Sequence, residues 1–133
     1  MNRETIREKT MQLIYQMDAS GIFDASKLSL IEEDAAVLNK KQAQITLDAV
    51  RDHLEEIDEL ISANLEKWSI ERVAKTDLAI MRTAVAEMLY IEKIPSAVSI
   101  NEAVRLSKLY SDDNSYKFVN SVLGKIANSL EQA

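Results

Sequence analysis

Glycine and proline are almost absent from this chain, which holds two glycines and one proline in 133 residues. Tight turns depend on these residue types, because glycine tolerates positive φ and proline fixes φ. A β-sandwich or barrel needs many such turns, whereas a few long helices need few. Hydrophobic residues make up 47% of the chain, which is enough for a core. The sequence therefore predicts an all-α fold.

Apolar residues recur at helical spacing along most of the sequence. Ile6, Leu13 and Met17 lie on one stripe, which predicts a first helix that ends near Gly21. Residues 77–92 leave almost no polar face, and this pattern predicts a buried helix at the centre of the domain. The same spacing predicts about seven helices in total. The others lie over residues 29–38, 41–66, 69–73 and 99–110, and the apolar stripe of a last helix runs from 119 to 130.

Two capping-box patterns and one proline indicate where helices begin and end. Ser29 with Glu32, and Ser99 with Glu102, place serine and glutamate three positions apart, as at a helix N-terminus. Pro95 is expected to end the helix before it.

The composition limits the cell compartments and the classes of binding partner that fit this chain. There is no cysteine, which excludes disulfides, thiol catalysis and cysteine-bound metal clusters. No apolar run approaches the roughly 18 residues that span a bilayer, and the first residues are charged, so we expect a cytoplasmic protein with no membrane partner. The net charge of −6 argues against indiscriminate coating of nucleic acid.

The charge is unevenly distributed along the chain. Lysine and arginine exceed aspartate and glutamate by one in residues 1–17 and by two in residues 105–125. If the two ends of the chain meet, they form a mildly basic face on an acidic body. The ordinary alternative is that these charges belong to solvated helix faces.

Patterns typical of enzymes are missing. His53 is the only histidine, so the chain cannot supply the two Glu-x-x-His pairs of a di-metal bundle, and we expect a surface residue there. A Gly-x-Ser-x-Gly turn does not occur, and Gly21 and Gly124 lie too far apart for a phosphate loop. We therefore predict no catalytic residues, no metal and no cofactor.

Two aromatic features suggest different roles. Trp68 lies beside a predicted helix junction and is expected in the core rather than as a base-stacking platform. Tyr116, Lys117, Phe118 and Asn120 open the last helix, where free backbone amides attract phosphates. Aromatic rings next to a cation are typical of single-stranded nucleic-acid binding. The alternative is a core Phe118 beside a solvated Lys117.

Several motifs, in order and spacing, resemble the NusB family over nearly the whole chain, most weakly over residues 18–45. They are REKTMQLIY at 7–15, WSIER at 68–72, DLAIMR at 77–82, IPSAV at 94–98, INEAV at 100–104 and KFVN at 117–120. The combination of the last three at these separations is highly specific.

The resemblance implies a non-catalytic, single domain over residues 1–133, made of two packed three-helix subdomains. It implies a transcription antitermination factor that binds the boxA element of nascent ribosomal RNA transcripts. It also implies two protein partners: NusE, a small-subunit ribosomal protein, and RNA polymerase with other Nus factors.

The resemblance also suggests the binding residues. Phosphates and bases of RNA would be held by residues from both ends of the chain, which would form one site: Arg3, Arg7, Lys9, Tyr15, Tyr116, Lys117, Phe118 and Asn120. Arg7 is expected on the polar side of the first helix, and Glu71 and Asp77 are expected to meet a basic face of the NusE-type partner.

One departure from the family pattern bears on affinity. The N-terminus of the family is often arginine-rich, whereas Glu4 and Thr5 stand here where further basic residues are expected. Each lost phosphate contact weakens binding, so the protein alone should bind RNA weakly. Two alternatives stay open, namely a protein–protein module whose RNA binding has decayed, and a homodimer that masks the first helix.

Overall fold

The first helix has a defined cap at each end. The computed structural model describes residues 1–132, and α1 spans Arg3–Ser20. The Asn2 side chain accepts a hydrogen bond from the Thr5 amide at 2.8 Å, which satisfies one of the free donors of the first turn. Gly21 follows with φ of 73°, the left-handed conformation that ends many helices. The predicted end near Gly21 is confirmed.

The segment after α1 is less helical than predicted. A 3₁₀ turn at Ala25–Lys27 precedes α2, which spans only Glu32–Ala35, and a second 3₁₀ turn follows at Ala36–Asn39. Ser29 lies before α2 and does not cap it, so the helix predicted over 29–38 begins too early. Leu28 and Leu30, on either side of Ser29, pack against the core, and this packing holds the chain outside the helix.

The helix α3 spans Lys41–Ala63 and is interrupted at His53, where φ is −128° and ψ is 28°. The prediction of 41–66 is therefore right at the start and three residues too long at the end. The Asn64 side chain donates to the Leu60 carbonyl at 2.8 Å and closes the last turn.

The helix α4, Lys75–Tyr90, is the buried centre of the molecule, as its sequence predicts, and a 3₁₀ turn at Ile70–Arg72 precedes it. All residues from Asp77 to Glu87 are buried.

The helices α5, Ser96–Tyr110, and α6, Ser115–Glu131, complete the fold. Pro95 occupies the N-cap of α5, five residues beyond the end of α4, so it opens a helix rather than ends one. Ser99 lies inside α5 and donates to Glu87 at 2.8 Å. The predicted capping box of Ser99 with Glu102 is therefore wrong, because the serine has a buried carboxylate as its partner.

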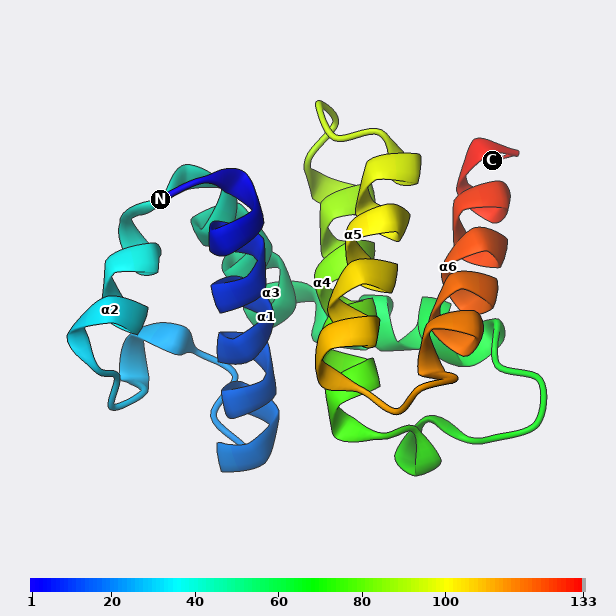
Figure 1. Cartoon of the computed structure of the whole chain (residues 1–133), viewed down its shortest axis with the longest axis horizontal. Coiled ribbons are helices and arrows are strands. Elements are labelled where there is room, and N and C mark those ends of the chain that lie inside the picture. Colours follow the sequence, from blue (N-terminus) through cyan, green and yellow to red (C-terminus); the bar gives the residue numbers. More distant parts are fainter. Residues whose placement is uncertain (133) are drawn as a thin grey trace.

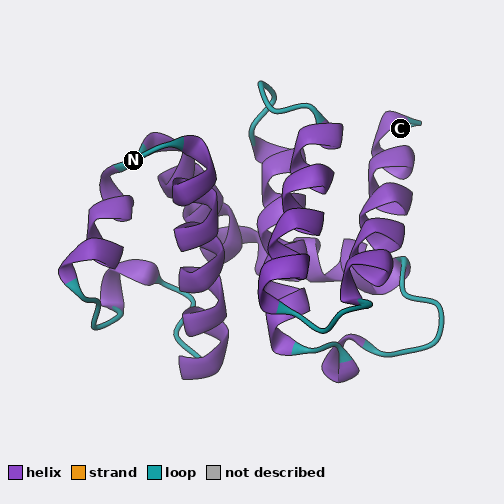
Figure 2. Ribbon diagram, viewed as in Figure 1, coloured by secondary structure: helices purple, strands orange, loops and turns teal. Residues whose placement is uncertain are grey.

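The helices form two groups of three, α1 to α3 and α4 to α6, which lie side by side (Figure 1). Contacts of α4 with α1 and α3 join the groups. Residues 1–132 contain six α-helices and three 3₁₀ turns but no strand, which confirms the all-α prediction (Figure 2). None of these helices has the length and apolar content needed to cross a membrane.

Candidate nucleic-acid interface

Arg7 belongs to the core and not to the surface. Its side chain is 7% exposed, and its Nε and Nη2 donate to the two carboxylate oxygens of Glu87 at 2.7 and 3.2 Å. Its Nη1 donates to Glu102 at 3.1 Å. The prediction that Arg7 lies on the polar side of α1 is wrong, because two carboxylates from α4 and α5 hold the guanidinium between the helices. All three of these nitrogens have protein partners and face away from solvent.

The other two basic residues of α1 lie closer to solvent. Arg3 is exposed in the first turn, whereas Lys9 is half-buried and its Nζ lies 3.1 Å from Asp34 of α2. Of the three predicted phosphate ligands in α1, Arg3 is the one whose side chain is exposed to solvent.

Tyr15 lies in a small aromatic groove between α1, α4 and α5. The groove has a volume of about 320 Å³, and Tyr15 and Tyr110 present exposed rings there. The Tyr110 hydroxyl donates to Glu8 and accepts from Gln12 at 3.2 Å. The hydrogen bond to Glu8, partial burial and the charge of Glu8 raise the pKa of Tyr110.

Sequence reasoning did not single out Tyr110, although it continues the buried stripe of its helix. Ser99, Ala103 and Leu106 on that stripe are buried, but Tyr110 is the last helical residue, where the neighbouring elements no longer cover it. The sequence feature that indicates Tyr110 is a large aromatic residue at the end of an apolar stripe.

The predicted cluster at the start of α6 is partly exposed. Lys117 and Asn120 are exposed, whereas Tyr116 and Phe118 are half-buried. Lys108 of α5 lies with its Nζ 4.7 Å from the centre of the Tyr116 ring, and the Lys117 Nζ lies 6.0 Å from it. The ring therefore has two ammonium groups within cation–π range.

A larger groove lies next to this cluster. Its volume is about 880 Å³, and its wall includes Trp68, Arg72, Asp77, Phe118 and the loop 111–115. Trp68 is 57% exposed, so the expectation of a core residue is wrong. The chain from 64 to 69 runs between α3 and the 3₁₀ turn before α4, and it leaves the indole at the rim of the groove.

The two acidic residues predicted to meet a partner differ in exposure. Asp77 is 5% exposed, and its carboxylate accepts a hydrogen bond from the Ser111 hydroxyl at 2.6 Å. Asp77 is therefore not the surface charge that was expected, because it anchors the loop between α5 and α6. Glu71 is exposed, and hydrogen bonds from its own backbone amide and from Ser69 lower its pKa.

The two ends of the chain meet through α5 rather than directly. Tyr110 contacts α1, and Lys108 contacts the start of α6. The helices α1 and α6 run in opposite directions, so their N-terminal ends point to opposite ends of the molecule (Figure 1). Because α1 has 18 residues and a length of about 27 Å, Arg3 and Lys117 belong to an extended strip and not to one compact pocket.

Two packed three-helix units, with aromatic and cationic side chains on their helix surfaces, define a small all-α protein of the helical-bundle class. The family model described as the NusB family matches residues 4–128. The chain therefore belongs to the NusB family. This is a family of transcription antitermination factors and not of enzymes.

Individual relatives agree over the full length. The transcription antitermination protein NusB of Bacillus subtilis (strain 168) is 40% identical over 135 residues, which cover 100% of both chains. The T. maritima NusB structure superposes with a TM-score of 0.80 at 30% identity and covers 96% of this chain and 92% of that one. A chain in a complex described as antitermination factors NusB and NusE with dsRNA has a TM-score of 0.71 at 24% identity, covers 96% of each chain and shows the shared fold.

Proposed function

We propose that the whole chain acts as one RNA-binding domain, which binds boxA-type single-stranded RNA in nascent ribosomal RNA transcripts. It does so together with a NusE-type ribosomal protein, and the pair joins RNA polymerase and other Nus factors. Membership of the NusB family supports this proposal, and a solved relative is described as a complex of NusB and NusE with dsRNA.

The observation that carries the RNA-binding proposal is a strip of exposed aromatic and cationic side chains across three helices. Tyr15 and Tyr110 line one groove, and Lys108, two residues before Tyr110, covers the ring of Tyr116. Lys117 follows with an exposed ammonium group. Lys108 and Tyr110 lie on opposite sides of the last turn of α5, so this turn carries the strip from α1 on one side to α6 on the other.

Each residue type in the strip has a distinct role in the proposal. Bases of single-stranded RNA stack on the tyrosine rings, and their edges give sequence preference. Lys108, Lys117 and Arg3 hold phosphates, which supply affinity and fix the register of the strand. The exposed Asn120, one turn beyond Tyr116 on α6, offers donor and acceptor groups to a base edge.

The larger groove is proposed as the contact for the NusE-type partner. Trp68 and Arg72 are exposed at its wall, and these residue types are enriched at the energetic centres of interfaces. Glu71 lies between them in sequence and offers an exposed carboxylate to a basic partner face. Asp77 acts indirectly here, because it holds Ser111 and with it the loop that forms the opposite wall.

The RNA site is tested by measuring the affinity for a boxA-like RNA across salt concentrations, with the NusE-type partner present. Lys117→Ala should reduce the slope of log affinity against log salt by about 0.7, because one phosphate contact is lost from a single strand. Tyr110→Ala should weaken binding by about 1–3 kcal/mol with little change of slope, because it removes a stacking ring.

The matched control is Lys93→Ala, which removes an exposed lysine from the turn between α4 and α5, at the far end of α5 from Lys108 and Tyr110. It should change neither affinity nor slope. An unchanged slope in Lys117→Ala would exclude the α6 half of the site. If no RNA binds with or without the partner, the protein is instead a protein–protein module, and a concentration-dependent mass in sedimentation would support a homodimer.

A further inference from the structure

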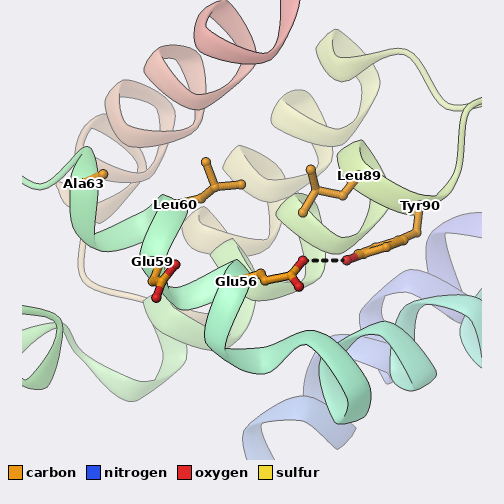
Figure 3. Close-up of a pocket in the computed structure, with 6 residues that line it drawn as sticks. All are labelled: Glu56, Glu59, Leu60, Ala63, Leu89 and Tyr90. Carbon is orange, nitrogen blue, oxygen red and sulfur yellow. Dashed lines mark hydrogen bonds between the residues drawn. The ribbon is translucent and has the colours of Figure 1, made fainter. Parts of the chain in front are cut away.

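A third groove lies between the later part of α3 and the end of α4, and it shares no lining residue with the proposed RNA strip. Its volume is about 410 Å³. It is lined by Glu56, Glu59, Leu60 and Ala63 of α3 and by Leu89 and Tyr90 of α4. The side chains of Leu60 and Leu89 point towards each other across it, so its floor is apolar (Figure 3).

The carboxylates beside this floor do not pair with lysine or arginine. Asp58, on the same helix, pairs with Arg82, and Glu66, beyond the helix end, pairs with Lys125. Within residues 1–132, Glu56 and Glu59 form no ion pair with lysine or arginine, and the one nitrogen near them is the His53 Nδ1, 3.7 Å from Glu56. No lysine or arginine of this part of the chain therefore neutralises the negative charge beside the groove.

Aromatic contacts hold one end of the groove in place. The His53 ring stacks on the Tyr90 ring with centroids 4.9 Å apart and an angle of 20°. The Tyr90 hydroxyl donates to Glu56 at 3.4 Å, a bond also drawn in Figure 3. The break of α3 at His53 coincides with this stack, so α4 holds the bend that turns the later part of α3 along the groove.

We propose that this groove binds a basic amphipathic helix of a partner protein. The leucines would receive the apolar face of that helix, and Glu56 and Glu59 would meet lysines or arginines on its flanks. An amphipathic helix in an apolar groove is a recurring mode of peptide recognition. The site is additional to the RNA and NusE-type contacts and does not depend on them.

Charge complementarity favours this occupant over the others. The phosphates of RNA would be repelled by the carboxylates of Glu56 and Glu59. A second copy of this chain has the same net charge of −6, which disfavours its approach to an acidic face. Because the RNA strip and this groove have separate linings, the protein could hold RNA and a basic protein segment at the same time.

The test uses the full chain and three synthetic peptides of one length. The first has leucine at positions i, i+3, i+4 and i+7 and lysine elsewhere, the second replaces lysine with glutamate, and the third replaces leucine with serine. Affinity is measured by fluorescence anisotropy at low salt, and the site is mapped from backbone amide chemical shifts. We expect the first peptide alone to bind, with shifts concentrated in 56–63 and 89–90.

The double variant Glu56→Lys/Glu59→Lys should weaken binding of the first peptide about tenfold, because two attractions become repulsions. The matched control Glu32→Lys/Glu33→Lys makes the same charge change at exposed positions of α2 and should bind as the parent does. Equal affinities in the two double variants, or equal binding of the serine peptide, would overturn the proposal. Self-association that the first double variant abolishes would identify a second copy as the occupant and overturn it as well.

Discussion

Replacing Arg7 with alanine should strongly destabilise the protein. The Glu87 side chain is 1% exposed, and its carboxylate accepts hydrogen bonds from Arg7 Nε, Arg7 Nη2 and the Ser99 hydroxyl. Without the guanidinium, this buried carboxylate keeps only the serine as a donor. Removing one partner of a buried ion pair costs about 3–5 kcal/mol, because the other charge is left without compensation.

The expected loss is large enough to measure by thermal unfolding. For 133 residues, typical unfolding entropies convert a loss of about 3–5 kcal/mol into a fall of about 11–18 °C in Tm. The assay is helical circular dichroism against temperature, with urea denaturation as an independent measure of the free energy of unfolding.

Two further variants test whether the loss of stability comes from the buried ion pair or from the removal of an arginine as such. Arg3→Ala removes an exposed arginine from the same helix and should change the free energy of unfolding by less than about 0.5 kcal/mol. Arg7→Met with Glu87→Leu should recover most of the lost stability, since replacing both members of a buried pair with apolar residues is often neutral. If Arg7→Ala unfolds at nearly the parent temperature, the buried pair is not a stabilising contact and the reasoning is refuted.

Three further predictions concern the two glycines and one tyrosine. Gly21→Ala should lower the free energy of unfolding in urea by about 1–2 kcal/mol, because φ of 73° strains any residue with a Cβ even where no atom lies within 4 Å of it. Gly124→Ala should raise the same quantity by about 0.5–1 kcal/mol, because its site in α6 is helical and open. Glu8→Gln should lower the pKa of Tyr110, because the Glu8 hydrogen bond and charge raise it. The pKa is measured by ultraviolet titration, in which the signal of Tyr110 is the difference between the protein with and without the Tyr110→Phe change. Since the folded pKa is raised, the contribution of Tyr110 to stability is complete below the free-tyrosine pKa of about 10 and is lost as pH rises through the folded value.

The fold class and most helices follow from the sequence, because helix formation depends on neighbours three and four residues away. The stripe through Ile6, Leu13 and Met17 lies against the core, and the nearly all-apolar run in α4 is the buried centre. Where a predicted helix boundary is wrong, contacts in the tertiary structure are the cause. Ser29 is held outside α2 by the packing of its neighbours, and Ser99 serves a carboxylate of another helix.

The candidate binding surface could be predicted by residue type but not by exposure. The sequence determines that Arg7, Trp68 and Asp77 have groups able to bind RNA or protein. Only the tertiary structure decides that Arg7 and Asp77 are buried and that Trp68 is exposed. The partners of Arg7 and Asp77 lie 80 and 34 positions away in sequence. A charged side chain enters a protein interior only where such a partner offsets its desolvation, and the chain brings the partners together only when its helices pack.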